Sequence, residues 1–527
     1  MRACLATVTA ILIGCTGALP DAEDIEDGVV VEDGKEDNFL SLTAREFVLE
    51  GKATVVAAAG ASDADVKKLI GLRQIAIAWF LNQYLVDKEH EDANADYGGF
   101  GAMAKAGSYE ELAIRKVNAT TWEFTFAQII AGRTNLMSAL PLDDDNVLAL
   151  EVGKPTNEEM AKLETNNEWY REDPWENWDP SKVPGDKKET LRLTVREEER
   201  SADAWWDYKQ LFADGKLDID VYFGWDYHDA YHLKHSKQFY TWLVGRGFRS
   251  PVSSFDRLTR QSAPLTRTIS ADGKSVKVEV RILYGKPGSD TDPDTDAGGK
   301  VLEDEMRASV KTRDVIVYSG HSGPFYGFAL ANWKKTEEGD FDDDDMKTAP
   351  MAGKYQVILA EGCDTYQIGQ AFLDNPAKNG VNVDVITTTS FSDASSPATV
   401  EKFISRMIEL DSLGRHRPRT VKSLLEELDA STGWGFHTMY GVHGIDDNPT
   451  LHPYAREDRL CRSCTSNAQC GGVGNACVTV GNSGRHCAAA CSDDSGCPTG
   501  YACKKIASAS ASTIYATMCV PETNRCQ

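Results

Sequence analysis

A thiol and an imidazole stand at matching places in this sequence, each directly after a short apolar segment. His321 follows residues 314–319, and Cys363 follows residues 355–360 with one acidic residue and one glycine between. Such segments are typical of strands buried in a parallel sheet. Because parallel strands end at the same edge of a sheet, we expect His321 and Cys363 to meet there. A thiol beside an imidazole is the minimum for nucleophilic acyl transfer.

Cys363 also lies directly before a predicted helix, at residues 366–373. The N-terminal amides of that helix favour the thiolate, whereas Glu361 and Asp364 oppose it. An unpaired cysteine is often a plain core residue, but such a residue would lie inside the strand rather than at its end.

The order of these motifs resembles that of the caspase-like cysteine peptidases, a group that includes caspases, legumains, gingipains, separases and the CHAT branch. In that group an apolar strand ends in a His followed by Gly, and the next strand ends in the nucleophilic Cys. The helix at 366–373 and the strand at 383–386 look most like the CHAT version. The resemblance covers residues 214–430 and rests on motif order together with strand context.

The resemblance implies a role for each matching residue. Cys363 would be the nucleophile and His321 the general acid–base, and the backbone N–H groups of Gly323 and Cys363 would form the oxyanion hole. Glu361, two residues before the nucleophile, would line the pocket for the side chain preceding the scissile bond, which favours Lys or Arg. The family pattern is His-Gly, whereas Ser322 intervenes here. The N–H of Ser322 is therefore an alternative oxyanion donor.

Two other functions remain open for the same segment. One is a catalytically inactive caspase-like scaffold or adhesin. The other is a serine hydrolase, because residues 320–324 nearly match the G-x-S-x-G nucleophile elbow, with Ser322 as nucleophile and His437, His443 or His452 as base. The fifth position of that motif is Pro324 rather than Gly, and this alternative leaves Cys363 without a role.

A histidine cluster near residue 230 could hold zinc. His228, His232 and His235 accompany Asp226 and Asp229, and His residues at i and i+4 share a helix face. No further ligand motif completes the site, so we favour a polar helix start at the edge of the cleft and predict no metal site.

An acidic segment further along resembles a calcium loop. A register beginning at Asp294 puts Asp296 third, Gly299 sixth and Glu305 twelfth, but Gly298 occupies the fifth position, where an oxygen ligand is expected. The default interpretation is a solvated acidic loop, with calcium as the alternative. No cofactor is required for the predicted chemistry.

These residues need a sheet to position them, and the pattern from residue 217 onward supplies one. Strands are predicted at 217–223, 276–284, 314–319, 355–360 and 383–388, and helices at 231–243, 302–311, 366–373 and from Ser396. This alternation predicts an α/β catalytic domain over residues 213–455, with a mostly parallel sheet and helices on both faces.

Residues 39–212 are expected to form a separate α+β N-terminal domain. Apolar residues at helical spacing predict a helix at 66–86, and alternation predicts strands at 121–130, 147–152 and 190–195. Tryptophans are dense in its second half, and we expect them to fill a seam between domains. They are Trp169, Trp175, Trp178, Trp205 and Trp206.

The N-terminus reads as an export signal. Residues 1–15 have a positive start and a short apolar stretch ending at Cys15, in a pattern that resembles a bacterial lipobox. Lipidation of Cys15 would anchor the chain to a membrane, with residues 16–38 as an acidic tether. The alternative is an ordinary secretory signal cut near Ala18.

The C-terminal tail, residues 456–527, holds ten of the 13 cysteines. Eight of these cysteines form two successive modules of four, Cys464 to Cys487 and Cys491 to Cys519. Modules this short cannot build an apolar core alone and would depend on disulfides, which require an oxidising compartment. Cys461 and Cys526 lie outside the two modules, at the two ends of the tail, and the pairing of all ten cysteines stays open. The eight inner cysteines are Cys464, Cys470, Cys477, Cys487, Cys491, Cys497, Cys503 and Cys519.

Composition excludes some classes of function. The 527 residues carry a formal charge of −25, and no Lys/Arg-rich block offsets it, so binding to nucleic acid is not expected. No apolar run of about 18 residues predicts a membrane-spanning helix. The sequence predicts an exported bacterial thiol protease at the cell envelope, an outer-membrane or cell-surface lipoprotein or else a secreted protein, acting on a protein or peptide.

Overall fold

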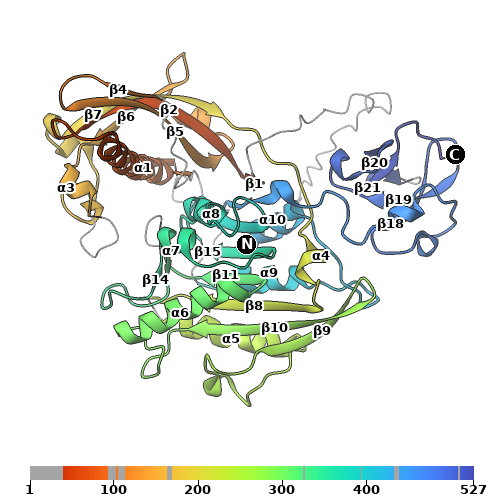
Figure 1. The fold of residues 1–527 in the computed structure, drawn as a ribbon. Coiled ribbons are helices and arrows are strands. Elements are labelled where there is room, and N and C mark those ends of the chain that lie inside the picture. Colours follow the sequence, from red (N-terminus) through yellow and green to blue (C-terminus); the bar gives the residue numbers. More distant parts are fainter. Residues whose placement is uncertain are drawn as a thin grey trace, which may run out of the picture.

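The computed structural model describes most of the chain after residue 38 (Figure 1). The described residues are 39–92, 102–104, 113–162, 169–228, 230–323, 327–392, 395–431, 438–508 and 511–526. The predicted signal, Cys15 and the predicted tether lie outside them. Among the described residues, no helix combines the length and the apolar character that crossing a bilayer requires.

An eight-stranded sheet forms the centre of the molecule. Its order is β1-β17-β16-β15-β11-β8-β10-β9, and the five strands from β16 to β10 are parallel. The parallel strands are β8 (Lys216–Phe223), β10 (Lys274–Tyr284), β11 (Val315–Ser319), β15 (Gln356–Glu361) and β16 (Val383–Thr388). The antiparallel strands at the edges are β9 (Leu265–Ala271), β17 (Tyr440–His443) and β1 (Phe39–Ser41).

The parallel strands do not follow chain order across the sheet. β8 is the first of them along the chain, and it lies between β10, the second, and β11, the third. Chain connections therefore leave β8 and β11 in opposite directions. In open α/β sheets such a switch point opens a crevice beyond the carboxyl ends of the two strands, where ligands bind.

Helices cover both faces of this sheet, because its strands are apolar on both sides. Val315 and Val317 of β11 pack into one core with α5, α9 and α10, while Ile316 and Tyr318 pack into a second core with α6, α7 and α8. The predicted α/β class with a mostly parallel sheet is confirmed. The helices are α5 (Tyr231–Gly245), α6 (Asp296–Thr312), α7 (Asp343–Thr348), α8 (Tyr366–Leu373), α9 (Ala398–Met407) and α10 (Val421–Asp429).

The N-terminal unit is a six-stranded antiparallel sheet packed on α1 (Asp63–Asp92). Its path runs β3-β5-β2-β7-β6, with β4 paired to β5. The strands are β2 (Ala44–Val56), β3 (Ala102–Ala104), β4 (Ala113–Lys116), β5 (Thr121–Arg133), β6 (Val147–Gly153) and β7 (Lys188–Glu197). The α1 side chains buried against this sheet include Ile70, Ile77, Phe80 and Leu81.

Four of the five tryptophans do not line the seam between domains that was expected, whereas Trp205 packs against His452 at the junction with the tail. Trp169, Trp175 and Trp178 surround Phe80 of α1, with ring centroids 4.6–5.7 Å from it, and fill the core of the N-terminal unit. Along the chain they lie between β6 and β7, and their segment folds back on α1. Trp206 instead belongs to the core of the central sheet.

The predicted boundaries of the N-terminal domain also differ from the structure at both ends. Residues 39–41 form β1, which pairs with β17 in the central sheet. Residues 206–212 include α4 (Tyr208–Leu211), whose Tyr208 and Leu211 are buried in the central core.

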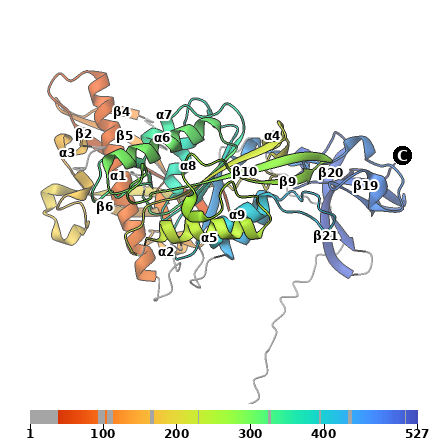
Figure 2. The ribbon, with the colours of Figure 1, turned by 90° about the horizontal axis from the view of Figure 1, so that it is seen from below.

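The N-terminal unit contacts the helix that follows Cys363. Tyr366 Oη donates a 2.6 Å hydrogen bond to Glu46 Oε1, and Asn82 Nδ2 lies 3.3 Å from Gln367 Oε1. The tail lies at the opposite end of the molecule from α1, as the second view shows (Figure 2).

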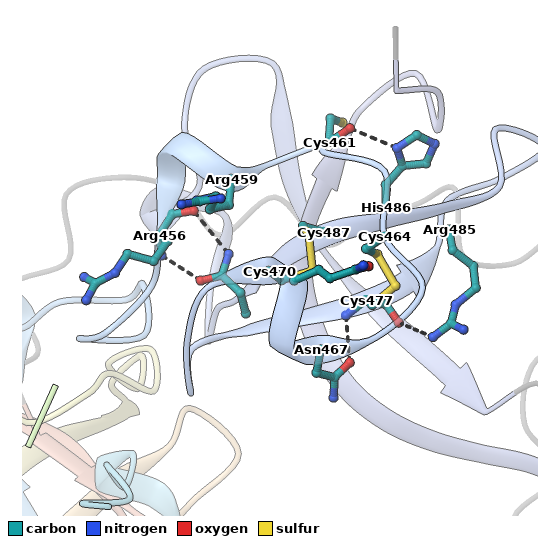
Figure 3. The surroundings of a disulfide bond; sticks show 12 residues. Arg456, Arg459, Cys461, Cys464, Asn467, Cys470, Cys477, Arg485, His486 and Cys487 are labelled. Atoms are coloured by element: carbon teal, nitrogen blue, oxygen red, sulfur yellow. Dashed lines mark hydrogen bonds between the residues drawn. A yellow bond between two sulfur atoms is a disulfide. The ribbon is translucent and has the colours of Figure 1, made fainter. Parts of the chain in front are cut away.

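All ten tail cysteines form disulfides, which confirms the prediction of a disulfide-rich tail. The second four-Cys module repeats the disulfide pattern of the first. Each four-Cys module joins its first Cys to its third and its second to its fourth, and Figure 3 shows the two bonds of the first module. The bond between Cys461 and Cys526 closes the ends of the tail. The other bonds are Cys464–Cys477, Cys470–Cys487, Cys491–Cys503 and Cys497–Cys519. They support a four-stranded sheet of β18 (Asn475–Thr479), β19 (Arg485–Ala490), β21 (Ala511–Pro521) and β20 (Tyr501–Ser508). Five disulfides indicate an oxidising, extracytoplasmic environment.

Removing the Cys461–Cys526 bond is expected to destabilise the tail by about 2–4 kcal/mol, because the bond closes a loop of 65 residues in the unfolded chain. The Cys461→Ala/Cys526→Ala double variant should show this in thermal unfolding followed by limited proteolysis. The loss of stability is compared with that of a Cys464→Ala/Cys477→Ala variant, because the bond removed there closes a loop of only 13 residues. An unchanged melting temperature of the tail in the first variant would contradict the expectation.

Candidate active site

The two strands that precede His321 and Cys363 are parallel neighbours, as expected. Ser319 of β11 lies opposite Glu361 of β15, and the N–H of Gly320 donates to the carbonyl oxygen of Glu361 at 3.1 Å. His321 and Cys363 therefore leave the sheet at the same edge.

The two strand-end loops also touch directly. Ser322 Oγ donates a 2.6 Å hydrogen bond to the carbonyl oxygen of Cys363. A Cβ on Gly362 would lie 2.2 Å from Ser322 Oγ and 2.9 Å from the carbonyl oxygen of Gly320. Only glycine at position 362 allows the loops to approach this closely.

A carboxylate from the other strand of the switch point holds the imidazole. Asp226 lies three residues after β8, and its Oδ1 is 3.0 Å from Nε2 of His321. The His321 ring stacks on the Tyr227 ring, with centroids 4.7 Å apart and an interplanar angle of 14°. Burial lowers the pKa of His321, and the hydrogen bond to Asp226 opposes that shift.

Asp226 is itself fixed in place. It is 7% exposed, and its Oδ2 accepts hydrogen bonds from the N–H groups of His228 at 2.9 Å and Tyr231 at 3.3 Å. From the sequence, Asp226 was expected only as part of the histidine cluster, and its contact with His321 was not predicted. The signal was present, because Asp226 follows the carboxyl end of a buried parallel strand just as His321 and Cys363 do.

Cys363 is the free thiol among the described cysteines, and it is half-buried. Burial raises its pKa to about 12, the negative charge of Asp364 adds to that effect, and hydrogen bonds from the backbone and side chain of Ser392 oppose it. The helix α8 begins at Tyr366, as predicted, but burial of the thiol outweighs the expected effect of the helix on the pKa of Cys363. The resting thiol is therefore protonated at neutral pH.

Glu361 was expected to line a pocket for a substrate side chain, but the structure buries it. It is 4% exposed, and the hydroxyl of Tyr440 donates a 2.6 Å hydrogen bond to its Oε2. The last residue of β15 points into the core between the sheet and its helices, so a Lys or Arg of a substrate would have to displace Tyr440.

The nucleophile-elbow interpretation of Ser322 does not fit the structure. Such an elbow is a turn from a strand into a helix. Here Ser322 and Gly323 form the short strand β12, which pairs with β13 (Gly327–Ala329), and the Ser322 hydroxyl is bonded to the carbonyl of Cys363. Gly323, the proposed oxyanion donor, lies in β12 opposite Gly327.

The histidines proposed as bases for Ser322 do not support it. His443 Nε2 lies 2.9 Å from Thr387 Oγ1 inside the core. His452 packs against Trp205 at the junction with the tail, and His437 lies outside the described residues.

The calcium loop, which was the alternative interpretation of the segment at Asp294, does not form. Thr295 caps α6, so positions three to twelve of the assumed loop lie in a helix instead of wrapping around an ion. Asp294 contacts Lys335 and Asn332, each at 2.6 Å. Glu305 is paired with Arg260 at 2.9 Å and with Arg281 at 3.1 Å.

The histidine cluster divides into two groups. His232 Nδ1 accepts a hydrogen bond from the N–H of Asp226 at 3.2 Å, and the His235 ring stacks on Tyr231, so both have structural contacts. His228 instead joins Asp226 and His321 (Nδ1 to Asp226 Oδ1, 2.9 Å). Asp229 lies outside the described residues.

Comparisons with protein-family models, with curated proteins and with solved structures find no match to this chain.

The raised pKa of Cys363 predicts an unusual alkylation profile. Since the thiolate is the reactive form, the rate with iodoacetamide should be low at pH 7 and rise about tenfold per pH unit beyond pH 10. An ordinary thiol levels off above a pKa of ~8.5. Peptide mapping without reductant, with free cysteine as reference, measures the rate at Cys363, and a plateau below pH 9 would contradict the prediction.

Proposed function

We propose that this protein is an exported cysteine endopeptidase with a caspase-like catalytic domain, in which Cys363 is the nucleophile and His321 the general acid–base. The observation that carries the proposal is the junction of β11 and β15, which brings both residues to one sheet edge, next to the switch point between β8 and β11. Asp226 adds the third group that orients a catalytic imidazole.

The tautomer of His321 follows from its contact with Asp226. A carboxylate accepts only, so Nε2 of neutral His321 carries the proton and Nδ1 keeps a lone pair. No hydrogen bond to Nδ1 occurs among the residues that the structure describes. This nitrogen is the one that we assign as the base.

The proposed reaction follows the usual course of thiol acyl transfer. With substrate bound, His321 Nδ1 takes the proton of Cys363, and the sulfur forms a bond to the scissile carbonyl carbon. Backbone N–H groups, those of Cys363 and of Gly323 or Ser322, would stabilise the oxyanion. His321 then gives its proton to the leaving amine as the C–N bond breaks, and water, deprotonated by His321, hydrolyses the thioester.

The raised pKa of Cys363 bears on how the nucleophile is activated. A thiol with a pKa of about 12 does not form a stable thiolate–imidazolium pair at neutral pH. We therefore propose that His321 removes the proton only during attack, in the manner of a serine hydrolase base.

The raised pKa of Cys363 also favours a second candidate function, that of a non-enzymatic scaffold with this fold. The Cys363 thiol interacts with Ser392 and is largely shielded, as a structural cysteine would be. Iodoacetamide does not separate the two candidates, because it reports only the thiolate fraction. A peptidyl acyloxymethyl ketone does, because it must occupy the substrate groove and use the active-site base.

The decisive test is labelling with a set of such ketones that differ in the residue next to the reactive carbon. The peptidase should gain one label at Cys363, and His321→Ala should lose that label yet keep alkylation by iodoacetamide at high pH. Absence of labelling by every probe, with normal alkylation, would favour the scaffold. Because Glu361 is buried, we propose no preference for basic residues, and the probe set measures the preference directly.

The location is proposed on separate grounds. The disulfide-rich tail indicates an extracytoplasmic site, and the sequence pattern before Cys15 favours a lipid anchor at the cell envelope. Metabolic labelling with a fatty acid, abolished by Cys15→Ala, tests the anchor independently of the enzymatic activity.

A further inference from the structure

Asp226 and His228 lie beside His321 of the candidate dyad, and the three residues bring three possible metal-ligand atoms together. Oδ1 of Asp226 lies 2.9 Å from Nδ1 of His228 and 3.0 Å from Nε2 of His321, and all three atoms lie within 4.8 Å of one another. Ligand atoms bonded to one tetrahedral zinc ion at ~2.0–2.2 Å are themselves about 3.3–3.6 Å apart, only slightly farther than the two contacts of Asp226 Oδ1. We propose that this Asp226–His228–His321 cluster binds Zn²⁺.

The cluster is built in the way that metal ligands usually are. The second oxygen of Asp226 is held by the N–H groups of His228 and Tyr231, which leaves Oδ1 directed at the two imidazoles. Such second contacts orient the ligand and raise the affinity for the ion. The Tyr227 ring, stacked on His321 and 4.1 Å from the His228 ring, fixes the planes of both imidazoles.

The ion would have a path to the site. The His228 side chain is 50% exposed and that of His321 is 21% exposed, whereas Asp226 forms the buried floor. Three protein ligands with a side facing solvent leave a fourth position for water, as in open zinc sites. The net charge of −25 also attracts cations.

The donor set selects the kind of ion. Two imidazoles and one carboxylate suit zinc, whereas calcium and magnesium prefer oxygen ligands alone. Lys334 opposes binding, because its Nζ lies 4.5 Å from the centre of the Tyr227 ring, next to His321. Replacing Lys334 should therefore tighten binding.

Binding would also change His321, and this consequence rests on the proposed function. An ion on Nε2 displaces the proton of that nitrogen, and the neutral ring then carries its proton on Nδ1. Nδ1 loses the lone pair that accepts the proton of Cys363. Zinc is therefore expected to inhibit the peptidase reversibly, and a chelator to restore it.

Calorimetric titration of chelator-treated Cys363→Ala protein with Zn²⁺ tests the site without the free thiol and without peptidase activity. We expect one zinc per chain, with at least tenfold weaker binding in an added His228→Ala substitution and tighter binding in an added Lys334→Ala. His228 is half-exposed, so the variant should fold, which its melting temperature verifies.

The outcomes separate the site from the enzyme. Equal zinc affinity with and without His228, or no zinc bound by the Cys363→Ala protein, overturns the metal site whatever the peptidase assays show. Zinc binding that depends on His228 supports the site even if no variant hydrolyses any peptide, in which case the proposed function fails alone.

Discussion

Replacing Cys363 by alanine is expected to lower kcat/KM for peptide hydrolysis by at least about 10³-fold, to the level of the background. Catalytic residues that act together lose nearly all of their joint contribution to the rate when the nucleophile is removed. The substitution should leave the fold intact, since Cys363 lies after β15 at the sheet edge and shares no disulfide. Hydrolysis of the peptide preferred by the wild type, measured beside the melting temperature, checks both points.

Cys363→Ser is the matched variant for this prediction. A serine hydroxyl occupies nearly the same space but is far less acidic than a thiol, so this variant should be similarly inactive. Retained activity in Cys363→Ala would exclude the thiol mechanism. If Ser322→Ala then removed that activity, the serine mechanism would be restored despite the position of Ser322 in β12.

Replacing Asp226 by asparagine is expected to lower kcat by about 10²–10⁴-fold with little change in KM. Asp226 lies behind His321 and orients it, so it acts as a positioning residue. An amide can donate as well as accept, which allows the tautomer of His321 that carries its proton on Nδ1 and cannot act as the base. Steady-state kinetics with the preferred peptide separate kcat from KM.

Two comparisons make the Asp226 prediction specific. Asp186→Asn changes an exposed carboxylate of the N-terminal unit and should leave both kinetic constants unchanged. Alkylation of Cys363 at high pH should proceed at the wild-type rate in Asp226→Asn, which shows that the sheet edge is intact. A kcat within a few-fold of wild type would remove Asp226 from the mechanism, and a parallel loss of melting temperature would show a structural role instead.

Local pattern identified His321 and Cys363 because each is placed by its own strand. An apolar segment buried on both faces leaves its first polar residues at the carboxyl edge, wherever the rest of the chain goes. Asp226 obeys the same rule after β8, but nothing in the sequence says that β8 pairs with β11. That neighbour relation depends on crossover connections, so the contact between Asp226 and His321, 95 residues apart, emerges only in the folded sheet.

The errors arose where a distant segment supplies the partner of a local motif. Glu361 has the spacing of a pocket residue, yet Tyr440 of β17 covers it. The calcium-loop spacing around Asp294 was overridden by the Thr295 cap of α6 and by Arg260 and Arg281, which pair with Glu305. Favourable local spacing is outweighed when a charged group finds a better partner across the fold.

Residue types and their order were enough to establish the alternating α/β class, the disulfide-dependent tail with its oxidising compartment, and the two strand ends where chemistry is expected. These features depend on burial and on chain order, which short stretches of sequence express directly. Which strands are neighbours, how the tail cysteines pair, how Asp226 holds His321 and how far the thiol of Cys363 is shielded depend on contacts between residues far apart in the chain. Such contacts form only when the whole chain packs, and they set the protonation states on which the proposed catalysis and the proposed metal binding both depend.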